Sequence, residues 1–96
     1  MPSDDVITKD EARPFLKKVP EWDMEETVIT RTFEFEDFSE ALDFVNDVGE
    51  IAEESQHHPD IDIRYNKVML LLTTHDKGGV TEADFAMAAR IDNLVD

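Results

Sequence analysis

The chain of 96 residues contains no cysteine, which excludes disulfides, thiolate metal sites and a cysteine nucleophile. It also lacks a hydrophobic run that approaches the roughly 20 residues needed to cross a bilayer. The N-terminal stretch MPSDDVITKD has neither the basic start nor the apolar segment of a secretory signal peptide. We therefore expect a cytoplasmic protein with no membrane-spanning segment.

Positive charge is scarce as well. The chain has 9 lysines and arginines against 24 aspartates and glutamates, so its formal net charge is −15. The acidic residues are spread along the whole chain and no basic stripe is present, which disfavours binding to nucleic-acid phosphates or to anionic membranes. Two readings stay open, an ordinary acidic protein and an adaptation to high salt. In both, self-repulsion should make assembly depend on salt.

Glycine is rare, and the pair Gly78-Gly79 is too little for a glycine-rich phosphate loop. The HExxH spacing of zinc hydrolases is absent too. The length and the 41% hydrophobic content fit one domain over residues 1–96 with a flexible start at 1–6. Because a domain of this size has modest stability alone, we expect it to form an oligomer.

Capping residues and hydrophobic periodicity divide the chain into helices and strands. Thr8 and Glu11 form a capping box for a first helix, although Pro14 should kink or shorten that helix. Asp37 and Thr81 are the N-caps of two further helices, and apolar–polar alternation predicts the strands. The predicted elements are a helix over 9–18, a short strand near 22–24, a strand over 27–36, a helix over 38–55, a strand over 61–65, a strand over 68–75 and a helix from 82.

The apolar positions of these elements predict one core. The run of apolar residues on both faces of 68–75 indicates a central strand. The order αββαββα predicts an α+β fold, a four-stranded antiparallel sheet with helices packed on one face. The predicted core positions are Phe15, Leu16, Trp22, Ile29, Phe33, Phe35, Phe38, Ala41, Leu42, Val45, Val48, Ala52, Phe85, Ala88, Ile91 and Val95, with Phe44 and Ile51 beside the helix stripe.

All the histidines lie between residues 57 and 75. His57 precedes one strand of a predicted hairpin and His75 ends its partner, so antiparallel pairing brings the two together. Asp84, in the first turn of the next helix, can approach the same rim. Glu53 precedes His57 by one helical turn. The geometry therefore predicts imidazoles flanked by carboxylates.

Three readings of this cluster remain open on spacing alone. Two imidazoles that titrate near neutral pH can act as a proton donor and acceptor. Three histidines with an acid can also bind zinc, although adjacent histidines usually point in different directions. The histidines can equally be junction residues with satisfied hydrogen bonds.

The stretch resembles the pterin-4a-carbinolamine dehydratase family, whose animal members are also known as the dimerisation cofactor of a homeodomain transcription factor. The family pattern is an acid, three residues, His-His-Pro, five or six residues, an aromatic, nine residues, a histidine, a short loop and an aspartate. The matching residues are Glu53, His57-His58-Pro59, Tyr65, His75 and Asp84. Similarity extends to Tyr65-Asn66-Lys67-Val68, Thr74-His75, Trp22 and the Phe35-x-x-Phe38 stretch, and so covers most of the chain.

The resemblance implies removal of water from a 4a-hydroxytetrahydropterin, without a metal or organic cofactor. The product would be the quinonoid dihydropterin, in the recycling of tetrahydropterin for aromatic amino-acid hydroxylases. His57 and His75 would be the acid and the base, in an order left open, and His58 a catalytic-site pterin contact. Glu53 and Asp84 would orient imidazoles, bind the pterin or serve only as helix-end charges. The remaining implied pocket residues are Gln56, Pro59, Thr73, Thr74 and Asp76.

The resemblance also bears on partners. It implies a homodimer that joins edge strands or a homotetramer that pairs helices, with a pterin-dependent hydroxylase as a possible partner. Gln56, Ile61 and Lys77 depart from the family pattern and could retune the substrate. The alternatives are a non-catalytic pterin-binding or assembly module and a related step in pterin or molybdopterin metabolism. Nothing in the sequence indicates the coactivator role of animal members.

Overall fold

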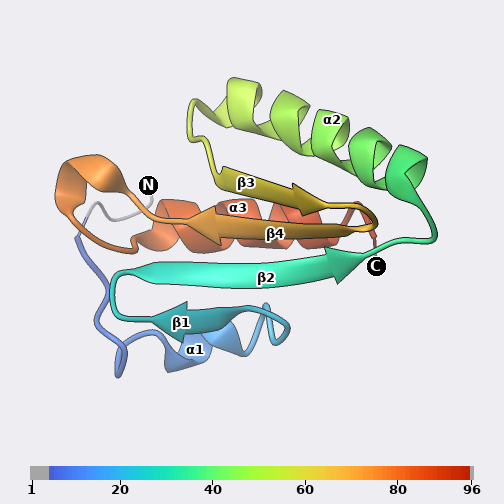
Figure 1. Cartoon of the computed structure of the whole chain (residues 1–96). Coiled ribbons are helices and arrows are strands. Elements are labelled where there is room, and N and C mark those ends of the chain that lie inside the picture. Colours follow the sequence, from blue (N-terminus) through green and yellow to red (C-terminus); the bar gives the residue numbers. More distant parts are fainter. Residues whose placement is uncertain (1–4, 96) are drawn as a thin grey trace.

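The computed structural model describes residues 5–95. The flexible start expected at 1–6 falls largely on residues 1–4, which lie outside this range. The predicted order αββαββα is confirmed, with one added 3₁₀ turn, η1, before the last helix (Figure 1). The elements are α1 (Arg13–Leu16), β1 (Asp23–Glu25), β2 (Val28–Glu34), α2 (Phe38–Ser55), β3 (Asp60–Arg64), β4 (Lys67–Leu72), η1 (His75–Lys77) and α3 (Glu82–Asp92).

The strands form one antiparallel sheet in the order β1-β2-β4-β3. As predicted, β4 is central, because it pairs with β2 on one side and β3 on the other. Its residues Val68, Leu70 and Leu72 are fully buried. They join Val48 of α2 and Ala88 of α3 in the hydrophobic core. The α+β architecture with helices against one face of the sheet is therefore confirmed.

The first helix is much shorter than the predicted 9–18. The capping-box contacts form, with the Thr8 N–H donating to Glu11 Oε1 at 3.0 Å and the Glu11 N–H to Thr8 Oγ1 at 3.3 Å. Only Arg13–Leu16 is α-helical, however, and Pro14 occupies its first turn. Proline has no N–H to donate to the preceding turn, so the segment before it stays a series of turns.

The apolar face of α2 is rotated from the predicted stripe. Phe44 and Ile51, which we placed beside the stripe, are buried, whereas Phe38 and Leu42 are 45% and 40% exposed. The prediction that Phe38 and Leu42 belong to the core is therefore wrong for this chain. Helical spacing allowed either set, and contact with β4 and α3 selects the face that carries Phe44.

The strands and the last helix end earlier than predicted. Strand β4 stops at Leu72 rather than at His75, because Thr73 and Thr74 leave the ladder and His75 opens η1. Gly78, at φ 77°, closes that turn by donating its N–H to the His75 carbonyl at 3.1 Å. Helix α3 ends at Asp92, so Val95, predicted to be buried, is 40% exposed.

A buried polar contact joins the far end of α3 to the sheet. Asp92 Oδ1 accepts from Trp22 Nε1 at 2.8 Å and from Arg31 at 2.6 Å. The Arg31 guanidinium also lies 4.2 Å from the centroid of the Phe33 ring. The predicted burial of Trp22 is confirmed, and its indole nitrogen contacts the last residue of α3. No helix within residues 5–95 combines the length and apolar character needed to cross a membrane.

Candidate active site

A pocket of about 210 Å³ lies where β3 begins and β4 ends. The β3–β4 register pairs Asp60 with Leu71, so the residues just before β3 lie beside those just after β4. Helix α2 ends at Ser55, and the left-handed conformation of its C-cap residue Gln56 (φ 51°) turns the chain toward β3. The residues that line the pocket are Gln56, His57, His58, Thr73, Thr74, His75 and Asp76.

His57 is held from behind by Asp84. Its Nε2 is hydrogen-bonded to Asp84 Oδ1, and the His57 side chain is 18% exposed while that of Asp84 is fully buried. This contact crosses from the end of α2 to the first turn of α3. A buried carboxylate behind an imidazole fixes the ring's orientation and chooses which nitrogen carries the proton.

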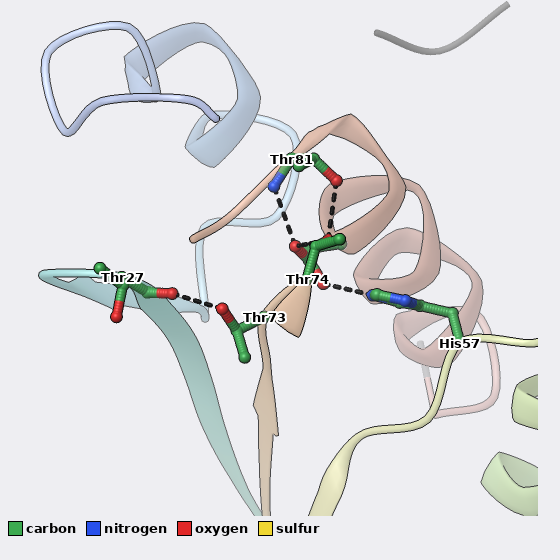
Figure 2. Close-up of polar contacts among 6 residues, drawn as sticks. Thr27, His57, Thr73, Thr74 and Thr81 are labelled. Atoms are coloured by element: carbon green, nitrogen blue, oxygen red, sulfur yellow. Dashed lines mark hydrogen bonds and ion pairs between the residues drawn. The ribbon is translucent and has the colours of Figure 1, made fainter. Parts of the chain in front are cut away.

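Asp84 is itself fixed by two threonines. Its Oδ2 accepts from the Thr81 N–H at 2.9 Å and from the Thr74 hydroxyl at 2.8 Å. The hydroxyls of Thr74 and Thr81 are 2.9 Å apart. In Figure 2, His57 and Thr73 lie on opposite sides of Thr74, and the Thr73 hydroxyl points away from His57 and donates to the Thr27 carbonyl at 2.6 Å. Two donors, the Thr81 N–H and the Thr74 hydroxyl, thus hold Oδ2 of the carboxylate, while Oδ1 faces His57.

His58 and His75 are more open to solvent than His57. His58 Nε2 lies 2.6 Å from Glu53 Oε2, and the two side chains are 60% and 79% exposed. An exposed pair of this kind contributes little to stability. His75 begins η1, and no residue between 5 and 95 hydrogen-bonds its imidazole. The same pocket is therefore lined by His57, which is hydrogen-bonded to a buried carboxylate, and by His75, whose imidazole has no such bond within residues 5–95.

Every residue that lines the pocket belongs to the predicted site set. The other predicted residues lie around it: Asp84 is buried behind His57, Glu53 contacts His58, and Pro59 follows the pocket residues toward β3. Glu53 does not lie under His57 as the helical spacing suggested, because the helix ends before that turn is complete. Among residues 5–95, no three His, Asp or Glu side chains are grouped as a metal site requires.

The sequence did not lead us to predict that Thr81 takes part in the site. It was assigned only as a helix cap, yet its hydroxyl and its N–H both reach the Asp84 network. The signal was present in the three-residue spacing between the cap and the acid.

A larger groove of about 400 Å³ between α1 and α3 is lined by Phe15, Val19 and Phe85, with no histidine.

The fold and the pocket define a class of protein, a small antiparallel α+β domain in which His57, His58 and His75 line one pocket. Histidine is the side chain most often used for proton transfer in enzymes. The sequence profile of the family described as "Pterin 4 alpha carbinolamine dehydratase" matches residues 5–94. The chain therefore belongs to the pterin-4a-carbinolamine dehydratase family.

Two relatives show how far the sequence similarity extends. A protein of Thermomicrobium roseum, provisionally named pterin-4-alpha-carbinolamine dehydratase, is 52% identical over 79 residues, covering 82% of this chain and 85% of that protein. A protein of Chloroflexus aurantiacus with the same provisional name is 54% identical over 80 residues, covering 83% and 86%. The similarity thus spans more than four fifths of each protein.

Solved structures give the same family. The transcriptional coactivator/pterin dehydratase of Brucella melitensis superposes with a TM-score of 0.90 at 34% identity, covering 96% of this chain and all of that one (100%). A pterin dehydratase-like protein identified as a RuBisCO assembly factor in the alpha-carboxysome superposes with a TM-score of 0.63 at 26% identity. That match covers 76% of this chain and 84% of the other.

Proposed function

We propose that the protein catalyses loss of water from a 4a-hydroxytetrahydropterin to give the quinonoid dihydropterin. The observation that carries the proposal is the pocket that His57, His58 and His75 line together, with His57 braced by the buried Asp84. Family membership supplies the substrate class. The histidines supply chemistry that this substrate needs.

The reaction is a proton transfer at two places on one molecule. The 4a-hydroxyl leaves with its electron pair and takes up a proton to become water. A ring N–H loses a proton, and its electrons form the new double bond of the quinonoid ring. One acid and one base balance the step, and protein side chains can serve as both. His57 and His75 are the proposed pair, because both line the pocket.

The other pocket residues hold the pterin. His58 is exposed enough to contact the ring while Glu53 fixes its orientation. Gln56, Thr73, Thr74 and Asp76 provide polar groups of the kind that bind the edge of a pterin. Pro59 restricts the backbone of His58 to extended conformations. The product would be reduced and returned to an aromatic amino-acid hydroxylase, which is the proposed functional partner.

A second candidate is a binding or assembly role without turnover. It is favoured by the pterin dehydratase-like neighbour that is named as a RuBisCO assembly factor. Ile61, which is 40% exposed on the edge strand β3, is an apolar contact that such a role could use. Self-association into a dimer or tetramer fits both functions, since β3 and the exposed Phe38 and Leu42 of α2 leave apolar surface open.

A pterin assay separates the two functions. Purified protein should accelerate the decay of 4a-hydroxytetrahydropterin above the rate in buffer, at low and at high salt. The double variant His57→Ala/His75→Ala should lose this acceleration while keeping its circular dichroism spectrum. Tight pterin binding by wild type with the buffer rate of decay would instead support the binding role.

A further inference from the structure

The buried carboxylate behind His57 has its hydrogen-bonding capacity divided between its two oxygens. Oδ2 accepts from the Thr81 N–H and the Thr74 hydroxyl, and Oδ1 faces His57 Nε2. The Asp84 side chain is fully buried, so no solvent can rearrange this division. No buried side-chain nitrogen or oxygen in the described part of the chain lacks a partner. Oδ2 therefore bonds only to the two threonines, and Oδ1 bonds only to His57.

The direction of each hydrogen bond follows from the number of protons. Thr74 has one hydroxyl proton and donates it to Asp84. Thr74 Oγ1 is therefore the acceptor in its 2.9 Å contact with Thr81 Oγ1, and Thr81 donates. The Thr74 hydroxyl and the Thr81 N–H thus both donate to Asp84, and the Thr81 hydroxyl donates to Thr74. A carboxylate surrounded by donors in this way can only accept, including from His57.

This fixes the tautomer of His57. If Asp84 only accepts, the proton of a neutral His57 lies on Nε2, and Nδ1 keeps its lone pair. No residue between 5 and 95 hydrogen-bonds His57 Nδ1. Because Nε2 faces Asp84, Nδ1 is the nitrogen left for a ligand in the pocket. His57 in this form takes a proton and does not give one.

We propose that Thr74 is a positioning residue, which acts through Asp84 to make Nδ1 of His57 the base of the proposed dehydration. The inference rests on the proposed function for its reaction, and His75 is then left as the acid. Thr74 lines the pocket and also touches Asp84, so it connects the pterin site to the carboxylate. Thr73, one residue earlier, bonds only to backbone and has no such link.

Kinetics of Thr74 variants test the positioning role. Thr74→Val keeps the side-chain shape and removes the hydroxyl, and loss of such an outer hydrogen bond should lower kcat about 10- to 100-fold. Thr74→Ser retains the hydroxyl and should restore kcat to near the wild-type value. A pocket contact alone would raise KM and leave kcat in place. Thr32→Val is the matched control, because Thr32 is an exposed residue of β2 outside the pocket.

The tautomer is measured without turnover. In protein labelled with ¹⁵N-histidine, the His57 signals, assigned with His57→Gln, should show a protonated Nε2 and an unprotonated Nδ1 at a pH where the ring is neutral. Thr74→Val should weaken this preference, and Thr32→Val should not. Thermal melts of each variant establish that the fold is retained.

The outcomes separate the two proposals. Wild type without dehydratase activity refutes the proposed function, whereas the tautomer in the ¹⁵N spectrum still decides the hydrogen-bond assignment. Active wild type with a proton on Nδ1 overturns the inference. So does Thr74→Val with wild-type kcat and an unchanged spectrum.

Discussion

Replacing Asp84 by asparagine should remove the base while keeping the shape of the site. Asparagine has one acceptor oxygen and one donor NH₂. Its oxygen is expected to stay with the Thr81 N–H and the Thr74 hydroxyl, which both need an acceptor. The NH₂ then faces His57 Nε2 and forces the His57 proton to move to Nδ1.

Two effects of Asp84→Asn can be given magnitudes. A positioned general base contributes about 10²- to 10⁴-fold to a rate, so kcat should fall by at least about 100-fold. Hydrogen bonds to a charged group are roughly twice as strong as neutral ones, and the two bonds to Oδ2 lose that advantage. We expect a loss of about 2 kcal/mol in the free energy of unfolding, at about 1 kcal/mol for each bond.

Stopped-flow decay of 4a-hydroxytetrahydropterin measures the first effect and urea unfolding the second. The matched control is Asp43→Asn, because Asp43 is an exposed residue of α2. This substitution should leave both kcat and the free energy of unfolding unchanged. The reasoning is wrong if Asp84→Asn keeps kcat within about twofold of wild type, well below the contribution expected of a base. It is also wrong if His57 keeps its proton on Nε2.

Three further predictions concern the fold. Asp92→Ala removes the acceptor of the buried Trp22 Nε1, so urea unfolding should show a loss of about 1 to 3 kcal/mol. Hydrogen bonds from the Thr8 N–H, and secondarily from the Thr8 hydroxyl, lower the pKa of Glu11. These bonds therefore stabilise the fold above the pKa of unfolded glutamate, and the stabilisation is lost as pH falls through the lower pKa of the folded state. NMR titration of Glu11 measures the pKa shift. Raising salt from about 0.1 to 1 M shortens the screening length from about 10 to 3 Å, so the melting temperature should rise.

Controls and contrary results are specific to each of these. Asp47→Ala removes an exposed carboxylate from α2 and should leave stability within about 0.5 kcal/mol of wild type. Asp92→Ala with wild-type stability would show that the buried contact contributes nothing. A Glu11 titration at the ordinary glutamate value, or one unaffected by Thr8→Ala, would contradict the pKa argument. A melting temperature that falls with added salt would contradict the repulsion argument.

Local sequence signals predicted the element order and the central position of β4. Those signals act over a few residues, as when Asp37 caps α2 by accepting from the Glu40 N–H at 2.9 Å. The rotation of α2 could not be read in the same way. Phe38 and Phe44 are both apolar residues in one helix, and only contacts from distant strands decide which of them is buried.

The site was predictable to the level of proximity but not of contact. Antiparallel pairing is enough to bring His57 and His58 toward Thr73 and His75. That Asp84 lies directly behind His57 depends on how α3 packs against the end of α2, which has no signature in sequence spacing. The link from Thr81 to that carboxylate is local, because the two residues form the capping box of α3, and their three-residue spacing is visible in the sequence.

The most direct test of the proposed account is the rate at which 4a-hydroxytetrahydropterin decays in the presence of the purified protein. The account predicts that the rate rises in proportion to the concentration of wild type. It also predicts that His57→Ala and His75→Ala, tested singly, each reduce this rate strongly without unfolding the chain. Decay at the buffer rate with folded wild type, at low and high salt, would contradict it.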